Sequence, residues 1–145
     1  MNNRYIFKGK RKDNGEWVEG FLSKSRGENK QLELCIDHEE KGVMCSSIVN
    51  PETVGQCTGL KDKNGKPIFE GDIVESRASE NKEDYKRWVI QFTDGSFCFE
   101  REIPRKRKYK YEQNLLGIDN IELYGLTVTG NVYDNLELLQ RSDER

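Results

Sequence analysis

The sequence contains little of what marks a membrane, secreted or polyanion-binding protein. No apolar run approaches the roughly 18 residues that a membrane-spanning helix needs. The opening residues, Met1 to Tyr5, lack the apolar stretch of a secretory signal. The formal net charge is only −2, so no overall field favours a nucleic acid or a membrane surface. These absences predict a cytoplasmic protein with no membrane partner.

Residues that commonly bind metals or form disulfides are also scarce. Histidine occurs once, and the four cysteines form no C-x-x-C pair and no other zinc or redox spacing. Each cysteine lies in an apolar, strand-like stretch, which predicts reduced, buried thiols, with a disulfide or a shared metal site as the alternative. The four are Cys35, Cys45, Cys57 and Cys98. The sequence therefore predicts no resident metal and no cofactor.

Catalytic patterns are missing as well. The single histidine, His38, lies in the polar run from Asp37 to Glu40, which predicts a solvated turn. A catalytic triad would need His38 to meet a nucleophile and an orienting acid, and no G-x-S-x-G elbow is present. Glycine-rich phosphate-binding motifs are absent too. No residue is predicted to be catalytic, and the chain is predicted not to be an enzyme.

What is present is a succession of short strand signals separated by turns. The 145 residues suit one domain over residues 1–145, with two very small subdomains as the alternative. Asn14-Gly15 and Asp94-Gly95 join β-forming stretches into hairpins, and the hairpin from Trp88 to Phe99 is the clearest. Further strands are predicted at Leu32–Asp37, Val43–Val49, Thr53–Thr58, Asp72–Glu75, Ile121–Tyr124 and Leu126–Tyr133, with a closing helical turn at 136–139 capped by Asp134 or Asn135.

Many short strands without an amphipathic helical stripe predict an all-β or β-dominated fold. The more specific prediction is a small SH3-like barrel extended by additional hairpins. A β-sandwich is one alternative. An α+β arrangement, in which the polar stretch from Ser76 to Lys86 is a helix rather than a loop, is the other.

The most informative run is Thr58 to Val74, which has the pattern of a strand exit, two turns and a strand entry. The first turn is predicted to be of type I, followed by a glycine with positive φ. At the second turn an aspartate carboxylate is predicted to accept backbone N–H groups. The residues of this turn signature are Gly59, Asp62, Asn64, Gly65, Gly71 and Asp72.

This run resembles the signature of the YopX family, T-G-L-x-D-x-N-G-x-x-I-[YF]-E-G-D-I-V. Gly15 to Gly20 and Gly130 to Leu139 are similar to the family's early strand and its closing segment. The departures are Cys57, where an aromatic residue is common, and Leu136, where proline is common. The resemblance implies a phage or prophage protein with a mostly β fold, and it supplies no catalytic residues.

Three carboxylates crowd this signature, those of Asp62, Glu70 and Asp72. If they converge in an open pocket they can hold Mg²⁺ or Ca²⁺, and a metal-dependent hydrolase or nuclease follows. If they point at backbone N–H groups they only cap turns. The second outcome is the one expected, and no metal ligand is predicted.

A basic segment, Arg101 to Tyr111, carries a local charge of +5 against −7 for the rest of the chain. It is predicted to be an exposed connection, because Pro104 breaks the strand and the charges cannot be buried unpaired. Its cations suit phosphates and its tyrosines suit stacked bases, so it is a candidate nucleic-acid contact. The residues concerned are Arg105, Lys106, Arg107, Lys108, Tyr109, Lys110 and Tyr111.

The alternative for this segment is a solvated loop without a ligand, or a contact to a protein. Lys8, Lys10, Arg11 and Lys12 would strengthen the nucleic-acid hypothesis if they share one face. The resemblance implies a phage or prophage accessory protein, and the missing catalytic pattern predicts that it acts as a non-catalytic binding module. They leave its partner open between a protein and a nucleic acid of the phage or host, and they leave a homo-oligomer open as well.

Overall fold

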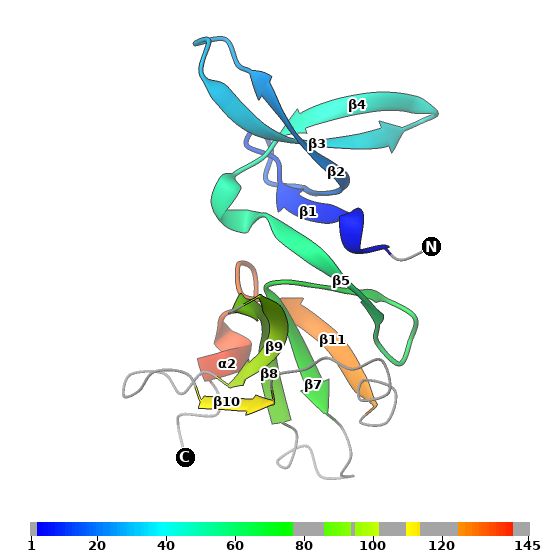
Figure 1. Cartoon of the computed structure of the whole chain (residues 1–145), viewed down its shortest axis with the longest axis vertical. Coiled ribbons are helices and arrows are strands. Elements are labelled where there is room, and N and C mark those ends of the chain that lie inside the picture. The colour runs from blue at the N-terminus through cyan, green and yellow to red at the C-terminus, as the bar shows by residue number, and fades with distance from the viewer. Residues whose placement is uncertain (1–2, 77–85, 94, 102–109, 114–124, 141–145) are drawn as a thin grey trace. The chain divides into compact units, whose positions relative to one another are not determined.

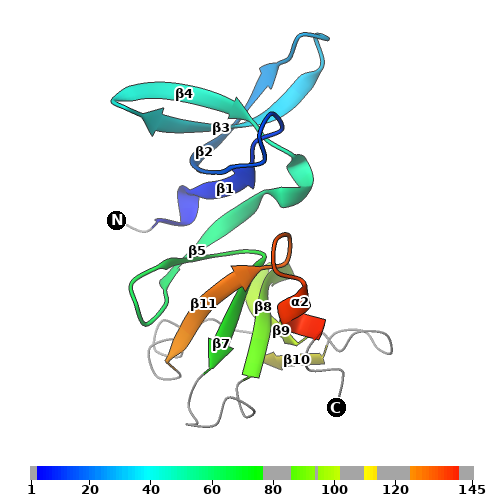
Figure 2. The same ribbon diagram turned by 180° about the vertical axis from the view of Figure 1, so that it is seen from behind.

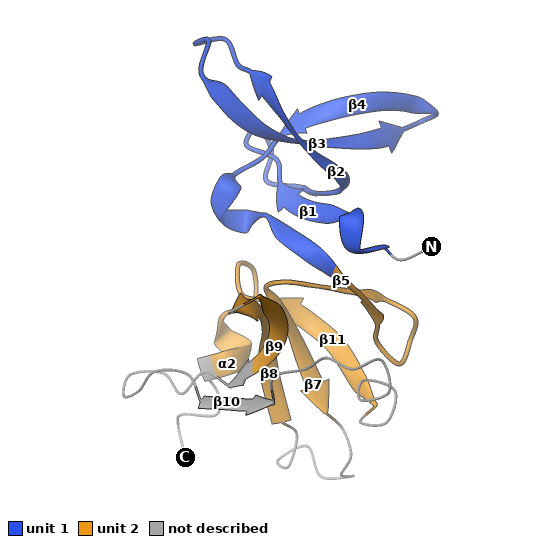
Figure 3. Cartoon of the chain, in the orientation of Figure 1, with its two compact units in different colours: residues 1–57 blue, residues 58–145 orange. Residues whose placement is uncertain are grey.

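The computed structural model describes residues 3–76, 86–93, 95–101, 110–113 and 125–140. The chain divides into two compact units, residues 1–57 and residues 58–145 (Figure 3). Both are built from antiparallel strands, so the predicted all-β class is confirmed. Every helix within the described residues is too short to cross a membrane. The single domain stays a prediction, because two compact units can still unfold together.

Unit 1 is a sheet of consecutive hairpins in the order β4-β3-β2-β1-β5 (Figure 1). Strands β1, β2 and β3 each pair antiparallel with the next strand in the sequence, and β5 lies against the other side of β1. Strand β5 then continues into unit 2, where it adjoins β6. The elements are η1 (Asn3–Tyr5), β1 (Phe7–Lys10), β2 (Trp17–Arg26), β3 (Leu32–Glu40), β4 (Val43–Ile48), η2 (Pro51–Thr53) and β5 (Gly55–Lys61).

The turns of unit 1 are set by residues with positive φ. Gly15 has a φ of 73° in the predicted turn between β1 and β2. Between β3 and β4, Lys41 and Gly42 have φ values of 52° and 78°, the pattern of a two-residue type I′ turn. The polar run from Asp37 to Glu40 was predicted to be a solvated turn, and this is wrong: it forms the end of β3. The turn uses only Lys41 and Gly42, so the residues of β3 up to Glu40 remain paired with β4.

The predicted strand from Thr53 to Thr58 begins later than expected. Pro51 starts the short helix η2, where its fixed φ is suited to the first helical position. The side chain of Asn50 caps this helix by accepting the Glu52 N–H at 3.3 Å. Two other predicted features, the loop or helix after Ser76 and the strand at 121–124, lie at 77–85 and 121–124, outside the described residues.

Unit 2 contains a five-stranded antiparallel sheet in the order β10-β9-β8-β7-β11. The hairpin predicted from Trp88 to Phe99 is confirmed as β8 and β9, with Gly95 at its turn. As far as the structure describes it, this order is open, with β10 and β11 at the edges, so the SH3-like barrel stays a prediction. The elements are β6 (Pro67–Phe69), β7 (Asp72–Ser76), β8 (Lys86–Thr93), β9 (Ser96–Arg101), β10 (Lys110–Gln113), β11 (Leu126–Asn131) and α2 (Glu137–Gln140).

Both faces of this sheet are covered by other residues. Neighbouring side chains of a strand point to opposite faces, and two neighbours on β7 belong to two different buried clusters. On one side Val74 belongs to a buried cluster with Ile68, Ile90, Phe99 and Leu126. On the other side Ile73 packs with Val89 and with Leu139 of α2, which lies beside β8 (Figure 2). The predicted closing helical turn is thus present, and it covers the second face.

We expect Gly71→Ala to destabilise the protein more than Gly65→Ala. Both glycines have positive φ, 89° and 82°, where a side chain costs about 1 kcal/mol. A Cβ at Gly65 meets nothing within 4 Å, whereas one at Gly71 lies 3.1 Å from the Tyr133 ring. The crowding adds about 1 kcal/mol to the loss at Gly71. Urea denaturation measures both values, and Tyr133→Ala in each background should remove the difference. An equal loss in the two single variants would contradict this packing.

Candidate functional site

The Asp62 carboxylate joins the signature turn to a strand far along the chain. Its Oδ1 accepts the N–H groups of Asn64 at 2.8 Å and Lys66 at 2.9 Å, which closes the turn between β5 and β6. Its Oδ2 accepts the N–H of Val128 in β11 at 3.0 Å. The side chain is buried, with 5% of its surface exposed. Asp62 therefore supplies the hydrogen bonds that hold the turn against the sheet.

Asp72 has the corresponding role at the second turn. Its side chain is fully buried, and its Oδ2 accepts the Phe69 N–H at 2.8 Å. The adjoining Gly71 donates its N–H to the Ile90 carbonyl at 2.7 Å and accepts the Val132 N–H at 2.9 Å. The signature thus connects β6, β7, β8 and the end of β11 through backbone hydrogen bonds.

These contacts decide between the two interpretations of the acidic signature. The carboxylates of Asp62 and Asp72 face backbone N–H groups, the arrangement expected of turn caps. Within the part of the chain that the structure describes, no three histidine, cysteine or acidic side chains lie close enough to hold a metal ion. The metal-dependent hydrolase or nuclease hypothesis loses the observation that motivated it.

The basic segment is only partly described. Arg105, Lys106, Arg107, Lys108 and Tyr109 lie outside the described residues. Lys110 and Tyr111 are not part of a connection, as was predicted, but begin β10, opposite Arg101 and Glu100 of β9. The alternation of lysine and tyrosine suits a strand, and tyrosine is a good strand former. The nucleic-acid contact through this segment stays a prediction.

The four N-terminal cations do not form one basic patch. Lys8 and Lys10 share a face of β1, and their Nζ atoms lie 4.9 and 5.5 Å from the centre of the Trp17 ring. Arg11 instead pairs with Asp13, with Nη2 and Oδ2 2.7 Å apart. The hydrogen bond between them raises the pKa of Arg11 and lowers the pKa of Asp13.

The fourth cation, Lys12, pairs with Glu33 of β3 at 3.4 Å. Arg11 and Lys12 are therefore matched by carboxylates, and only Lys8 and Lys10 meet the condition of a shared face. The N-terminal cations therefore give little support to the hypothesis that a nucleic acid binds the basic segment.

His38 lies in β3 with its Nε2 2.7 Å from the Ser47 hydroxyl oxygen on β4. Asp37 is the preceding residue on the strand and points to the opposite face of the sheet. There it accepts hydrogen bonds from Ser46 of β4 and Ser23 of β2, the latter at 2.9 Å. Serine, histidine and this aspartate therefore do not combine into a triad.

The cysteines occupy different environments. Cys35, Cys57 and Cys98 are buried, as predicted, whereas Cys45 is partly exposed. Cys45 lies on β4, which ends the sheet of unit 1. A strand at the edge of a sheet has a neighbour on one side only, which leaves its side chains less covered.

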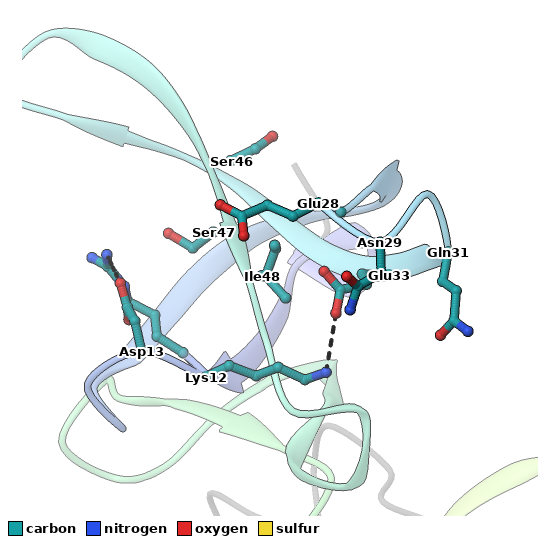
Figure 4. A pocket seen from close by; sticks show the side chains of 11 residues that line it. Lys12, Asp13, Glu28, Asn29, Gln31, Glu33, Ser46, Ser47 and Ile48 are labelled. Atoms are coloured by element: carbon teal, nitrogen blue, oxygen red, sulfur yellow. Dashed lines mark hydrogen bonds and ion pairs between the residues drawn. The ribbon is translucent and has the colours of Figure 1, made fainter.

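Among the described residues, a concave surface of about 530 Å³ forms a groove in unit 1. Its walls are the turn after β1 (residues 11–13), the turn between β2 and β3 with the start of β3 (residues 27–29, 31 and 33), and the end of β4 (residues 46–48). Figure 4 shows Lys12 reaching from one wall to Glu33 on another, with Glu28 and Asn29 nearby.

The residues that line this groove are mainly of polar types, with both signs of charge and two amide side chains. Such a surface suits hydrogen bonds to a peptide or to another polar chain more than burial of an apolar small molecule. Nothing in the sequence points to the groove, because three separate segments form its walls. Only the register of the β2, β3 and β4 hairpins brings them together.

We expect Asp62→Ala to cost about 3 kcal/mol of unfolding free energy, because it leaves three N–H groups without their charged acceptor. The neighbouring exposed Lys63→Ala is the matched control and should change stability by less than about 0.5 kcal/mol. Urea denaturation of both variants measures these values. Similar small losses in the two variants would show that the carboxylate is dispensable.

We expect the carboxyl group of Asp37 to titrate below its usual value of about 3.9. Hydrogen bonds from Ser46 and then Ser23 lower its pKa. Because the folded pKa is depressed, the ionised group adds stability above about pH 4, and this is lost as the pH falls through the folded pKa. Carbon-detected NMR titration measures the pKa, and Ser23→Ala with Ser46→Ala should raise it. An unchanged midpoint in the double variant would refute the stated cause.

Two solved structures have the fold of this chain. The crystal structure of protein EF1440 from Enterococcus faecalis matches with a TM-score of 0.57 and 24% identity, covering 92% of this chain and 96% of that one. The structure of protein yopX from Bacillus subtilis matches with a TM-score of 0.52 and 20% identity, covering 96% and 97%. The comparison with curated proteins gave no match. The family model described as YopX protein matches residues 6–140, and this chain therefore belongs to the YopX family.

Proposed function

We propose that this protein is a non-catalytic binding module that serves a phage or prophage inside the bacterial cell. The phage association and the cytoplasmic setting come from the sequence features described above and from what the family resemblance implies. The binding role rests on one observation, the polar groove of unit 1. Its walls are fixed by paired strands, so a ligand meets a surface that is formed before it binds.

The distribution of acidic side chains supports binding rather than catalysis. General acid–base or metal-assisted chemistry requires carboxylates that face a reacting group. Asp62, Asp72 and Asp37 instead face backbone N–H groups or serine hydroxyls. In the groove, Asp13 and Glu33 are engaged with Arg11 and Lys12. Paired charges of this kind orient a ligand and select its polarity.

The position of the groove also favours a protein partner. It opens between two hairpin turns, and exposed side chains such as Glu28 and Asn29 line its rim. Turn residues on a rigid sheet are where binding surfaces are commonly found. We therefore place the proposed binding surface on unit 1 and assign the signature turns of unit 2 to stability.

Filling the groove should weaken partner binding. Asn29→Trp places a large side chain in it, and Asn3→Trp makes the same exchange on an exposed residue that does not line it. With the full chain as bait in cells carrying an induced prophage, the wild type and Asn3→Trp should retain a protein that Asn29→Trp loses. Titration of that purified protein should show binding weaker by about tenfold for Asn29→Trp.

Equal melting temperatures of the two tryptophan variants would show that the loss is not caused by unfolding. A captured protein that binds all three baits equally would remove the groove from the proposal. Turnover of a phosphodiester or peptide substrate by the purified chain would overturn the non-catalytic assignment.

A further inference from the structure

Strand β4 ends the sheet of unit 1, and its outward hydrogen-bonding groups can be assigned from the register. Val49 donates its N–H to the Leu34 carbonyl at 3.1 Å, so these two residues form a hydrogen-bonded pair. Such pairs alternate along an antiparallel ladder, and they recur at Ser47 and Cys45. The backbone N–H and C=O groups of Met44 and Ser46 therefore point away from β3. Among the described residues, no strand pairs with this edge.

The chain itself begins a further ladder at one end of this edge and then leaves it. The N–H of Lys12 donates to the Ile48 carbonyl at 3.0 Å, and the N–H of Asn50 donates to the Lys10 carbonyl at 2.8 Å. Arg11 and Val49 form an antiparallel bridge between these bonds. Beyond Lys12 the chain turns away towards β2, and the position beside Met44 and Ser46 is left to another strand.

The edge has none of the features that normally prevent such pairing. Protein edge strands are commonly protected by lysine, proline or inward-pointing charges. Strand β4, with the sequence VMCSSI, contains none of these. Val43 and Met44 are 63% and 64% exposed, so a strand laid beside them would also remove apolar surface from water.

The charge around this edge selects the kind of strand that it accepts. The hairpin of β3 and β4 carries four acidic residues and one lysine in its turn, and Glu28 adds another carboxylate at the rim of the groove. The four acidic residues are Glu33, Asp37, Glu39 and Glu40. Glu33 is paired with Lys12 and Asp37 accepts serine hydroxyls, so the exposed Glu28, Glu39 and Glu40 are the carboxylates that act on a partner. A second copy of this chain would bring two acidic hairpins together, whereas a strand bearing lysine or arginine would be attracted.

We propose that an extended basic segment of a partner protein pairs with β4 as an additional strand. The segment continues the ladder that Lys10 to Lys12 begin and spans residues 43–47 of β4. Its backbone bonds to Met44 and Ser46, and a basic side chain enters the adjoining groove beside Glu28. This inference rests on the proposed binding function and names the class of its partner.

The test uses the peptide acetyl-Lys-Val-Arg-Val-Lys-Val-Lys-amide, titrated into the isotope-labelled full chain. NMR shift changes should concentrate at residues 43–48 and 27–33, and hydrogen exchange of the Met44 and Ser46 amides should slow. A peptide with glutamate in place of every lysine and arginine should bind about tenfold more weakly. A peptide with N-methylated valines, which lacks about three of its seven backbone N–H donors, should also bind about tenfold more weakly.

Two variants at one position separate backbone pairing from side-chain contact. Met44→Pro removes an outward N–H that β3 does not use, and proline is tolerated at such edge positions. It should weaken peptide binding about tenfold, whereas Met44→Ala should weaken it no more than about threefold. If Met44→Pro fails to fold, Glu39→Lys with Glu40→Lys on the exposed hairpin should give the same loss.

Equal binding by Met44→Pro and Met44→Ala, or no binding at about 1 mM peptide, would overturn strand addition. A wild-type chain that dimerises, as measured by sedimentation, and loses this in Met44→Pro would show that the edge takes a second copy instead. A captured partner that depends on Asn29 but ignores Met44→Pro would refute this inference while leaving the proposed function intact. A captured partner that binds the wild type, Asn29→Trp and Met44→Pro equally would contradict both the proposed function and this inference.

Discussion

The fold of unit 2 depends on one buried carboxylate, that of Asp62. It accepts three backbone N–H groups, two from its own turn and one from Val128, which is 66 residues further along the chain. A charged acceptor can satisfy several donors at once, and each such bond is stronger than one between neutral groups. The turn between β5 and β6 is therefore held in its position by β11, and the hydrophobic cluster around Ile68 is assembled between them.

Unit 1 is organised differently, and this difference explains where we place binding. Its buried apolar side chains among the described residues are few, and the most enclosed are Cys35, Ile36, Val49 and Cys57. Gly9 makes this packing close, since a Cβ there would lie 3.2 Å from Ile36 and from Val49. A sheet with so small a core exposes much of its surface, including several large apolar side chains on β2, β3 and β4. Unit 2 buries its sheet on both faces, whereas unit 1 leaves its sheet accessible.

The features that the sequence predicted correctly are those with local causes. The turns at Gly15, Gly65 and Gly71 each need positive φ, which glycine adopts readily, and the turn signature has hydrogen-bonding side chains at fixed spacing. The apolar stretches on either side of Asp94-Gly95 similarly predicted the β8–β9 hairpin. The all-β class followed from the number of such turns.

The features that the sequence could not predict depend on pairing between distant segments. Beyond Asp37, strand β3 pairs with β4 and has no partner in β2, so the run to Glu40 is more open to water, and polarity alone does not distinguish such a strand from a turn. The groove has no signal of its own because the β2–β3–β4 register creates it. The partners of Arg11 and Lys12 likewise follow from the fold and cannot be read from the two cations themselves.

The order of strand pairing has a consequence for synthesis of the chain on the ribosome. In unit 1 the strands β1, β2 and β3 pair with their immediate successors, so each hairpin can form soon after it emerges. In unit 2 one side of β7 is filled only by β11, more than 50 residues after Asp72. Long-range pairings form slowly, and unsatisfied strand edges can recruit incorrect neighbours in the meantime. A nascent chain halted before Leu126 would have a nearly complete unit 1 and an unfinished unit 2.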